Sequence, residues 1–232
     1  MRRSAYRVLK ADPVMAALIG AAGPCRIQSH PERGPFEALA RAIAHQQLHG
    51  IAAGRILARF CALFTDAPFP APQQVLAASD QQLRAVGFSR AKVAALKDLA
   101  AKTIAAVVPG AAEIAQLSDA ELIERICSVR GIGRWTVEML LIFQLQRPDV
   151  LPVDDFGVRS GFRLAYGLKA LPTPRALAEF GERWKPYRST AAWYLWRAVD
   201  LARAQRLPPC PRPPRLSTAA RRRKVPARCA RR

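Results

Sequence analysis

Two predicted helices are joined by the short sequence Val129-Arg130-Gly131-Ile132-Gly133. Apolar side chains recur every three or four residues before it, with Ser118 as N-cap, and a second amphipathic helix runs from Arg134 to about Gln144 after it. Two glycines that bracket one apolar residue permit a tight turn with positive φ and leave the backbone amides uncovered by side chains. The sequence therefore predicts a helix-hairpin-helix unit over residues 119–144.

Such a hairpin can bind an anion, because the amides that begin its second helix point outward at the positive end of the helix dipole. Two arginines add full positive charges beside these amides. The simpler alternative is a plain turn between two packed helices. We expect a DNA phosphate to bind here, with contacts from Arg130, Gly131, Ile132, Gly133 and Arg134.

Two adjacent aspartates, Asp154 and Asp155, precede a third predicted helix that begins near Phe156. Carboxylates beside a phosphate site repel DNA, so this pair indicates a task such as stabilising positive charge during a reaction. Aspartate is also a favoured N-cap residue. The two roles are compatible, because one aspartate can cap the helix while the other faces a substrate.

Further motifs make a family resemblance specific. The stretch from Ile126 to Trp135, followed by Leu151-Pro152-Val153-Asp154-Asp155-Phe156, resembles the helix-hairpin-helix DNA glycosylases. The sequences Ala42-Ile43-Ala44-His45-Gln46-Gln47-Leu48 and Trp184-Lys185-Pro186-Tyr187-Arg188-Ser189 are similar to the 3-methyladenine DNA glycosylase II branch of that family. The resemblance extends from about Phe36 to Leu201.

The resemblance implies an all-α fold of two intimate helical subdomains with the active-site cleft between them. Only about 35 residues precede the first matched motif, too few for the N-terminal mixed domain of related bacterial enzymes, so one helical domain is expected over residues 1–206. The implied activity is base-excision repair: alkylated purines such as 3-methyladenine and 7-methylguanine are flipped out of duplex DNA and hydrolysed from the sugar, which leaves an abasic site. The alternatives are a non-catalytic helix-hairpin-helix DNA-binding protein and a glycosylase for other damaged bases.

The resemblance also implies individual roles. Asp155, twenty residues after Trp135, matches the catalytic aspartate, whose carboxylate stabilises the positive charge that develops on the sugar. Trp196 matches a tryptophan of the base pocket, and we also assign Trp135 and Met139 to that pocket. An aromatic residue is a plausible alternative at the position of Met139, and clustered aromatic residues can instead belong to the core.

A polar junction, His45 to Gly50, interrupts the predicted helical region of residues 36–63. An enzyme that extrudes a base must fill the vacated space in the stack, and the resemblance places that wedge on this junction. Gln47, Leu48 and His49 are the candidates. The alternative is that Leu48 is a core residue and the glutamines cap helix ends.

Lyase-competent relatives have a lysine two residues after the second hairpin glycine, where this chain has Trp135. We therefore expect a monofunctional enzyme that uses water as the nucleophile. The nearest lysines in sequence, Lys102 and Lys169, are expected to lie away from the pocket. A second glycine-containing turn, residues 86–92, is expected to be scaffold, with Arg90 and Lys92 solvated or in weak phosphate contacts.

The charge agrees with a nucleic-acid partner. The formal net charge is +20 and the pI is about 11.2, and this excess favours double-stranded DNA containing alkylated bases over a membrane. With neither an apolar span nor a signal peptide in the sequence, we expect a cytoplasmic monomer. Residues 207–232 carry nine Lys and Arg and no acidic residue. This Pro/Arg-rich tail is expected to be disordered and either to tether DNA phosphates or to be merely solvated.

Five cysteines and three histidines lack the spacing of a metal site. No iron–sulfur cluster, catalytic metal or required cofactor is expected. The resemblance implies a different ion, a monovalent cation such as Na⁺ or K⁺ that bridges the hairpin to a DNA phosphate. Its ligands would be the backbone carbonyls of Cys127, Val129 and Ile132, and oxygen ligation suits a hard cation.

Overall fold

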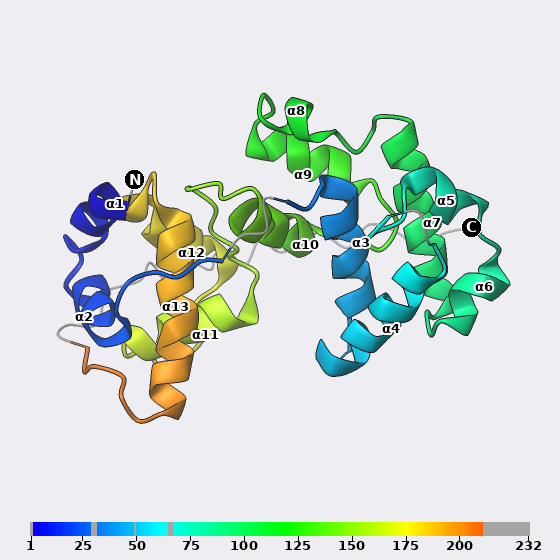
Figure 1. Cartoon of the computed structure of the whole chain (residues 1–232). Coiled ribbons are helices and arrows are strands. Elements are labelled where there is room, and N and C mark those ends of the chain that lie inside the picture. The colour runs from blue at the N-terminus through cyan, green and yellow to red at the C-terminus, as the bar shows by residue number, and fades with distance from the viewer. Residues whose placement is uncertain (1, 29–31, 49, 65–66, 211–232) are drawn as a thin grey trace, which may run out of the picture.

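The computed structural model describes residues 2–28, 32–48, 50–64 and 67–210 (Figure 1). These residues form helices and loops without a β-strand, which confirms the predicted all-α fold. His49 and residues 211–232 of the predicted tail lie outside the described residues. The α-helices are α1 (Arg2–Leu9), α2 (Pro13–Ala22), α3 (Pro35–His45), α4 (Gly50–Ala62), α5 (Pro72–Ala77), α6 (Asp80–Ala85), α7 (Arg90–Ile104), α8 (Ala111–Ile114), α9 (Asp119–Cys127), α10 (Arg134–Met139), α11 (Phe156–Ala165), α12 (Pro174–Gly181) and α13 (Arg188–Arg203).

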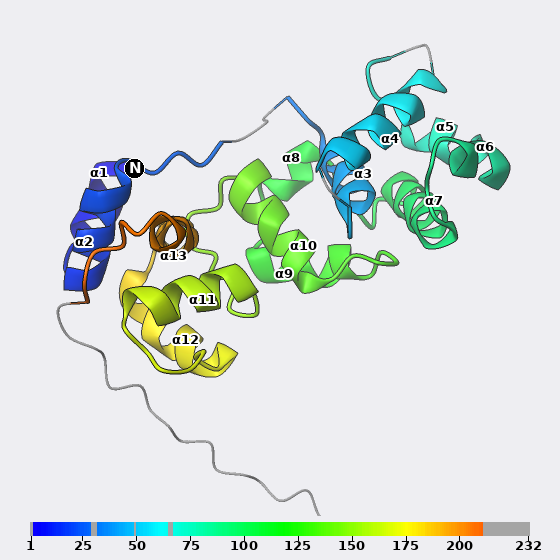
Figure 2. The same ribbon diagram turned by 90° about the horizontal axis from the view of Figure 1, so that it is seen from below.

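Two hydrophobic cores divide the helices into two lobes. The first core is built by α3 to α10 and the π-helical turn η1 (Leu140–Gln144) that continues α10. The second is built by α1 and α2 together with α11, α12 and α13, so the N-terminal helices pack beside the C-terminal ones (Figure 1). Ile27 and Trp196 contact both cores. Figure 2 shows α10 between the two groups of helices, where the lobes meet.

Local signals in the sequence explain where several helices begin. Asp12 caps α2 by accepting a hydrogen bond from the Val14 amide, with Pro13 at the first helical position. Ser118 and Glu121 form a reciprocal capping box at the start of α9. The cap at Ser118 confirms the predicted start of α9.

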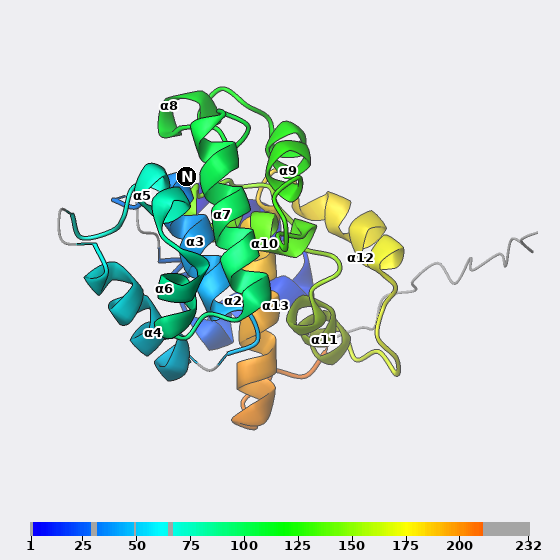
Figure 3. The same cartoon turned by 90° about the vertical axis from the view of Figure 1, so that its right-hand side faces the viewer.

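The long helix α7 lies across the first lobe in front of α3 and α10 (Figure 3). Lys92 near its start donates a hydrogen bond of 2.7 Å to the Ala44 carbonyl in α3, and burial lowers the pKa of this lysine. Lys92 is therefore a structural bridge rather than a solvated side chain, and its weak phosphate contact stays a prediction. The carbonyl it binds lies just before the polar junction that follows α3.

The second lobe depends on a close approach between α11 and α13. A Cβ atom on Gly161 would lie 1.8 Å from the Leu195 carbonyl oxygen, and a Cβ atom on Gly157 would lie 2.9 Å from Cδ1 of Trp196. These two glycines are four residues apart on one face of α11, so together they let α13 pack against its backbone. This contact brings Trp196 to the start of α11.

Leu207 and Cys210, at the end of the described chain, pack against the second core, so the disorder predicted from residue 207 onward is wrong for residues 207–210. Gly167 comes close to this segment, since a Cβ atom added to this glycine would lie 3.6 Å from Cβ of Cys210. None of the described helices is long and apolar enough to cross a membrane.

We expect Gly161→Ala to lower the free energy of unfolding by about 1–3 kcal/mol or more, because the added methyl group overlaps the backbone of α13. Chemical denaturation measures this change. Gly54→Ala is the matched control, because Gly54 lies in α4 with no atom within 4 Å of an added Cβ. Helix propensity should make that variant more stable by up to about 1 kcal/mol. An unchanged midpoint for Gly161→Ala would contradict the close approach.

Candidate active site

Asp155 lies half-buried at the N-terminus of α11, where it is the N-cap. One carboxylate oxygen, Oδ1, accepts hydrogen bonds from the Val158 amide at 2.7 Å and from Nε1 of Trp196 at 2.9 Å. The other oxygen, Oδ2, accepts one from Nε1 of Trp135 at 2.7 Å. Capping explains only the first of these three contacts. The two indoles hold the carboxylate in one orientation between two helices from different lobes.

The two tryptophans differ in exposure. Trp135, in the first turn of α10, is 50% exposed. Trp196, in α13, is half-buried and stacks on Phe143, with 5.6 Å between the ring centroids and 29° between the planes. The structure thus brings Asp155, Trp135 and Trp196 together, as the sequence predicted. One indole is open to solvent and the other forms part of the protein interior.

Phe143 is an aromatic neighbour of Trp196. From the sequence it is only one of the apolar residues of the helix predicted after the hairpin. Residues Leu140–Gln144 form a π-helix rather than the predicted continuation of α10, and the Leu145 amide donates to the Leu140 carbonyl at 3.0 Å. Such turns often occur at functional sites. Met139, which the sequence analysis assigns to the pocket, is half-buried and packs against the first core. Phe143 therefore supplies the ring that contacts Trp196.

The division of roles between the two aspartates needs a correction. One aspartate was expected to cap the helix while the other faced the substrate, but Asp155 does the capping and also binds both indoles. Asp154 is exposed and is not the N-cap. A single residue can take both roles because the carboxylate has two oxygens, and only Oδ1 is needed for the cap.

A buried carboxylate next to this site was missed by the sequence analysis. Glu138 is 3% exposed, and its Oε1 lies 2.9 Å from Nε of Arg134 in the same helix. Burial raises the pKa of Glu138, the Arg134 guanidinium opposes that rise, and the negative charges of Asp154 and Asp155 add to it. The i, i+4 spacing of Arg134 and Glu138 is the only sequence signal for the pair.

The hairpin has the shape expected for anion binding, with one difference at the second glycine. Gly131 has a φ of 75°, whereas Gly133 has a φ of −99° and is the N-cap of α10 without a side-chain cap. Gly133 is exposed, with no atom within 4 Å of an added Cβ, so the uncapped amides of α10 remain open to approach. Arg130 and Arg134 are exposed on either side.

Ile132 differs from the other predicted hairpin contacts. Its side chain is 4% exposed in the first core, and its amide donates to the Val129 carbonyl at 3.1 Å. It is therefore a packing residue that shapes the turn, and its amide is not available to a phosphate. The contact expected of Ile132 is corrected in this respect, since apolar residues between two glycines are often turned inward.

Three side chains hold the hairpin from outside. The Asp98 carboxylate accepts a hydrogen bond of 2.7 Å from the Arg130 amide, and Nε2 of Gln46 donates one of 2.9 Å to the Gly131 carbonyl. Lys102 forms an ion pair with Asp98 and donates to the Ser128 carbonyl. Burial alone would raise the pKa of Asp98, but the Arg130 amide and Lys102 outweigh it and lower the pKa. Lys102 thus contacts the hairpin, and its expected position away from the base pocket stays a prediction.

Gln46 connects the polar junction after α3 to the hairpin by its hydrogen bond to the Gly131 carbonyl. Gln47 has a φ of 56°, which is uncommon for a residue other than glycine, and its side chain is exposed. Leu48 is 39% exposed, which argues against the alternative that it is a core residue. Ile51, in the first turn of α4, is 77% exposed, and it is not among the wedge candidates predicted from the sequence. Backbone strain and exposed apolar side chains suit a wedge.

A known family model matches the part of the chain that carries the hairpin and the two aspartates. Residues 40–186 match the family model described as HhH-GPD superfamily base excision DNA repair protein. The chain belongs to this superfamily. The unit α9–α10 and Asp155 both lie within the matched residues.

Relatives and solved structures show which members of the superfamily this chain resembles. It is 43% identical to DNA-3-methyladenine glycosylase 1 of Schizosaccharomyces pombe over 81% of this chain and 82% of the relative. It matches a structure of 3-methyladenine DNA glycosylase from the same organism in complex with abasic DNA, with a TM-score of 0.74, 40% identity, and coverage of 86% and 98% of the two chains. A DNA-3-methyladenine glycosidase structure from Bacillus halodurans matches with a TM-score of 0.78, 29% identity, and coverage of 86% and 90%.

Within the described residues no group of three or more His, Cys, Asp or Glu side chains is placed to hold a metal ion. Cys61, Cys127 and Cys210 are free thiols.

We expect Gly157→Ala to displace Trp196, because the new Cβ would lie 2.9 Å from Cδ1 and 3.1 Å from Nε1 of that indole. The indole N–H signal of Trp196, assigned in ¹H–¹⁵N spectra by its loss in Trp196→Phe, should shift as its bond to Asp155 lengthens. Gly54→Ala again serves as the control for a helical Gly→Ala change. An unshifted signal in Gly157→Ala would show that Gly157 does not set the position of Trp196.

Proposed function

We propose that this chain is a monofunctional DNA glycosylase that removes alkylated purines, such as 3-methyladenine and 7-methylguanine, from double-stranded DNA and leaves an abasic site. The observation that carries the proposal is the placement of the Asp155 carboxylate between the indoles of Trp135 and Trp196. Names of similar proteins support it, since they include DNA-3-methyladenine glycosylase 1 and an alkylbase DNA glycosidase-like protein of Schizosaccharomyces pombe.

The chemistry of an alkylated purine fits this arrangement. Alkylation at N3 or N7 gives the base a positive charge and weakens its bond to the sugar, so little general-acid help is needed. Aromatic faces attract such a cation by about 0.5–2 kcal/mol. Trp135 offers an exposed face, and Trp196, backed by Phe143, offers a fixed one. A pocket of this kind selects weakly, which agrees with tolerance of several damaged bases.

Asp155 acts on the sugar rather than on the base. As the bond to the base breaks, positive charge develops on the sugar, and a carboxylate that is already oriented stabilises that charge without further reorganisation. The same carboxylate can align the attacking water. Its three N–H donors keep it fixed in a half-buried site, so the orientation does not depend on the substrate.

DNA is held by the hairpin and by the junction after α3. The uncapped amides at the start of α10, with Arg130 and Arg134 beside them, receive a phosphate. Gln47 or Leu48 fills the space that the flipped nucleotide leaves. A non-catalytic DNA-binding module would use the same hairpin, but it has no need for a carboxylate fixed by two indoles.

A monovalent cation at the hairpin belongs to the same proposal. Lys102 binds the Ser128 carbonyl and Gln46 binds the Gly131 carbonyl, so these two side chains engage different carbonyls from those of Cys127, Val129 and Ile132. The latter three would hold the cation, which supplies positive charge for a DNA phosphate. The basic tail of residues 207–232 remains a predicted tether for DNA phosphates.

The decisive experiment is to incubate the purified protein with duplex DNA containing 7-methylguanine and to measure the released base. We expect release by the wild-type protein and a decrease of about 10²–10³-fold or more in Asp155→Asn. Asparagine caps helices about as well as aspartate, so this variant should remain folded and bind DNA. Near-normal turnover in Asp155→Asn would contradict the role of the carboxylate, and no release by the wild type would refute the proposed activity.

The product should be an intact abasic site. Trp135 has no amine that can attack the sugar, and Arg134 beside it stays protonated, so no Schiff base should form. We expect no covalent protein–DNA species when borohydride is present during turnover, and no strand cleavage until alkali is added. Efficient trapping would overturn this prediction and identify an amine, with Lys102 at the hairpin as the first to replace by arginine.

A further inference from the structure

The segment Arg147–Asp155 carries the carboxylate of the site at its C-terminal end. It joins η1 to α11 without forming a helix or strand. Asp155 lies six positions after Asp149 in the sequence, and an extended chain of that length reaches up to about 20 Å. The chain therefore does not fix the position of Asp155, and contacts from other elements must do so.

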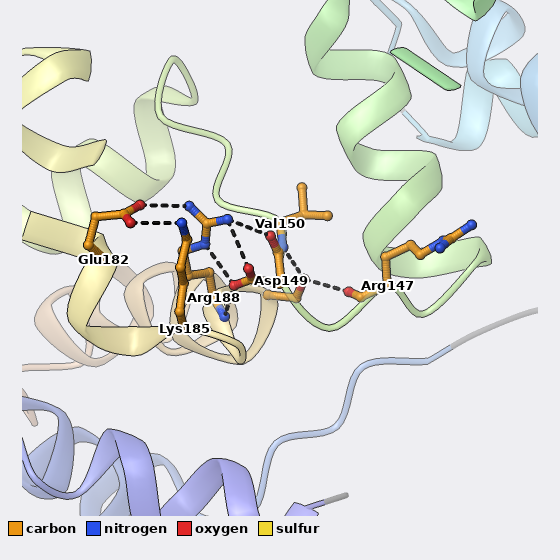
Figure 4. Close-up of polar contacts among 7 residues, drawn as sticks. Arg147, Asp149, Val150, Glu182, Lys185 and Arg188 are labelled. Atoms are coloured by element: carbon orange, nitrogen blue, oxygen red, sulfur yellow. Dashed lines mark hydrogen bonds and ion pairs between the residues drawn. The ribbon is translucent and has the colours of Figure 1, made fainter. Parts of the chain in front are cut away.

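Arg188, the first residue of α13, holds the upstream end of this segment (Figure 4). Its Nε lies 2.7 Å from Oδ1 of Asp149 and its Nη2 lies 3.0 Å from Oδ2, a bidentate ion pair. Nη2 also donates to the Asp149 carbonyl at 3.1 Å, and Nη1 lies 3.2 Å from Oε1 of Glu182. One guanidinium thus binds the side chain and the backbone of the segment at once.

Ser189 adds three hydrogen bonds to the same segment. Its hydroxyl donates to the Arg147 carbonyl at 2.6 Å and accepts from the Val150 amide at 3.0 Å, and its own amide donates to the Pro148 carbonyl at 3.0 Å. The residue is 3% exposed, so these bonds are shielded from water. Because a buried polar group left unpaired is costly, this arrangement specifies one position for residues 147–150.

The downstream end of the segment is held by the same helix. Trp196 lies eight residues after Arg188 in α13, about 12 Å along the helix axis, and donates to Oδ1 of Asp155. A rigid helix therefore contacts the segment at both ends. The contacts at the upstream end therefore add to the packing of α11 on α13 in setting where Asp155 lies relative to Trp196.

We propose that Arg188 and Ser189 are positioning residues for the reaction at Asp155. They fix residues 147–150 to the first turn of α13, and thereby hold the Asp155 carboxylate at the position where it accepts the hydrogen bond from Trp196. The inference rests on the proposed function, in which Asp155 stabilises the sugar cation. It also gives a task to the Arg188-Ser189 part of the motif that begins at Trp184. A displacement of about 1 Å at a reacting group can lower a rate on the order of 10²-fold.

The test compares Arg188→Gln, Arg188→Lys and Ser189→Ala with a matched control, Arg125→Gln. Arg125 is similarly half-buried, forms an ion pair of 2.6 Å with Glu113, and donates to the carbonyls of Val107 and Ala106, far along the chain from Asp155. Three quantities are measured: the melting temperature, the affinity for duplex DNA that contains an abasic-site analogue, and the single-turnover rate of 7-methylguanine release with enzyme in excess.

We expect Arg188→Gln to lower the single-turnover rate about 10–100-fold while the affinity for the abasic-site duplex changes by less than about threefold. Arg188→Lys, which retains the charge and one contact, should recover part of the rate, and Ser189→Ala should lower it. Arg125→Gln should lose comparable thermal stability without losing the rate. A rate that is unchanged in folded Arg188 and Ser189 variants, or that falls only in proportion to stability as in Arg125→Gln, would overturn the inference.

A readout independent of activity separates this inference from the proposed function. The indole N–H signal of Trp196 should move in Arg188→Gln and in Ser189→Ala, because its acceptor on Asp155 shifts, and should stay in place in Arg125→Gln. If the wild-type protein releases no base but the signal moves as expected, the proposed function fails and the positioning contact stands. If the signal does not move in either variant, the positioning contact is refuted whatever the activity.

Discussion

The two hydrogen bonds that Asp155 accepts from Trp135 and Trp196 join the two lobes of the molecule. Trp135 lies in α10, a helix of the first lobe, whereas Trp196 lies in α13, a helix of the second lobe. A carboxylate needs several directional donors before it is fixed in a half-buried place, and here each lobe supplies one indole. The orientation of the carboxylate and the relative position of the lobes therefore depend on each other.

The close packing of α11 on α13 is the condition for this contact. Without Cβ atoms at Gly157 and Gly161, the axis of α13 comes near enough for the Trp196 indole to reach Oδ1. Any larger residue at Gly161 would collide with the Leu195 carbonyl. Two residues that carry no functional group are thus as important for the geometry of the site as the residues that carry one.

Local features of the fold could be predicted from the sequence, because the interactions that produce them lie within a few residues. The caps at Asp12 and Ser118 and the turn at Gly131 are of this kind. The π-turn that presents Phe143, the burial of Glu138 and the bridge from Lys92 to α3 were not predicted, since each depends on a helix distant in sequence. Asp155 was identified through family resemblance, while its double role as cap and indole acceptor required coordinates.

The hairpin and the junction after α3 are also one unit. Gln46, the residue just before Gln47, donates a hydrogen bond to the Gly131 carbonyl. The backbone that carries the proposed wedge residues is therefore bonded to the loop that we propose binds a phosphate. Asp98 and Lys102 support that loop from α7, and the same helix binds the end of α3 through Lys92. Because α10 leads directly from the hairpin to Trp135, Gly133 lies two residues from the indole that contacts Asp155. One short helical turn therefore joins the proposed phosphate site to the residue that orients the carboxylate.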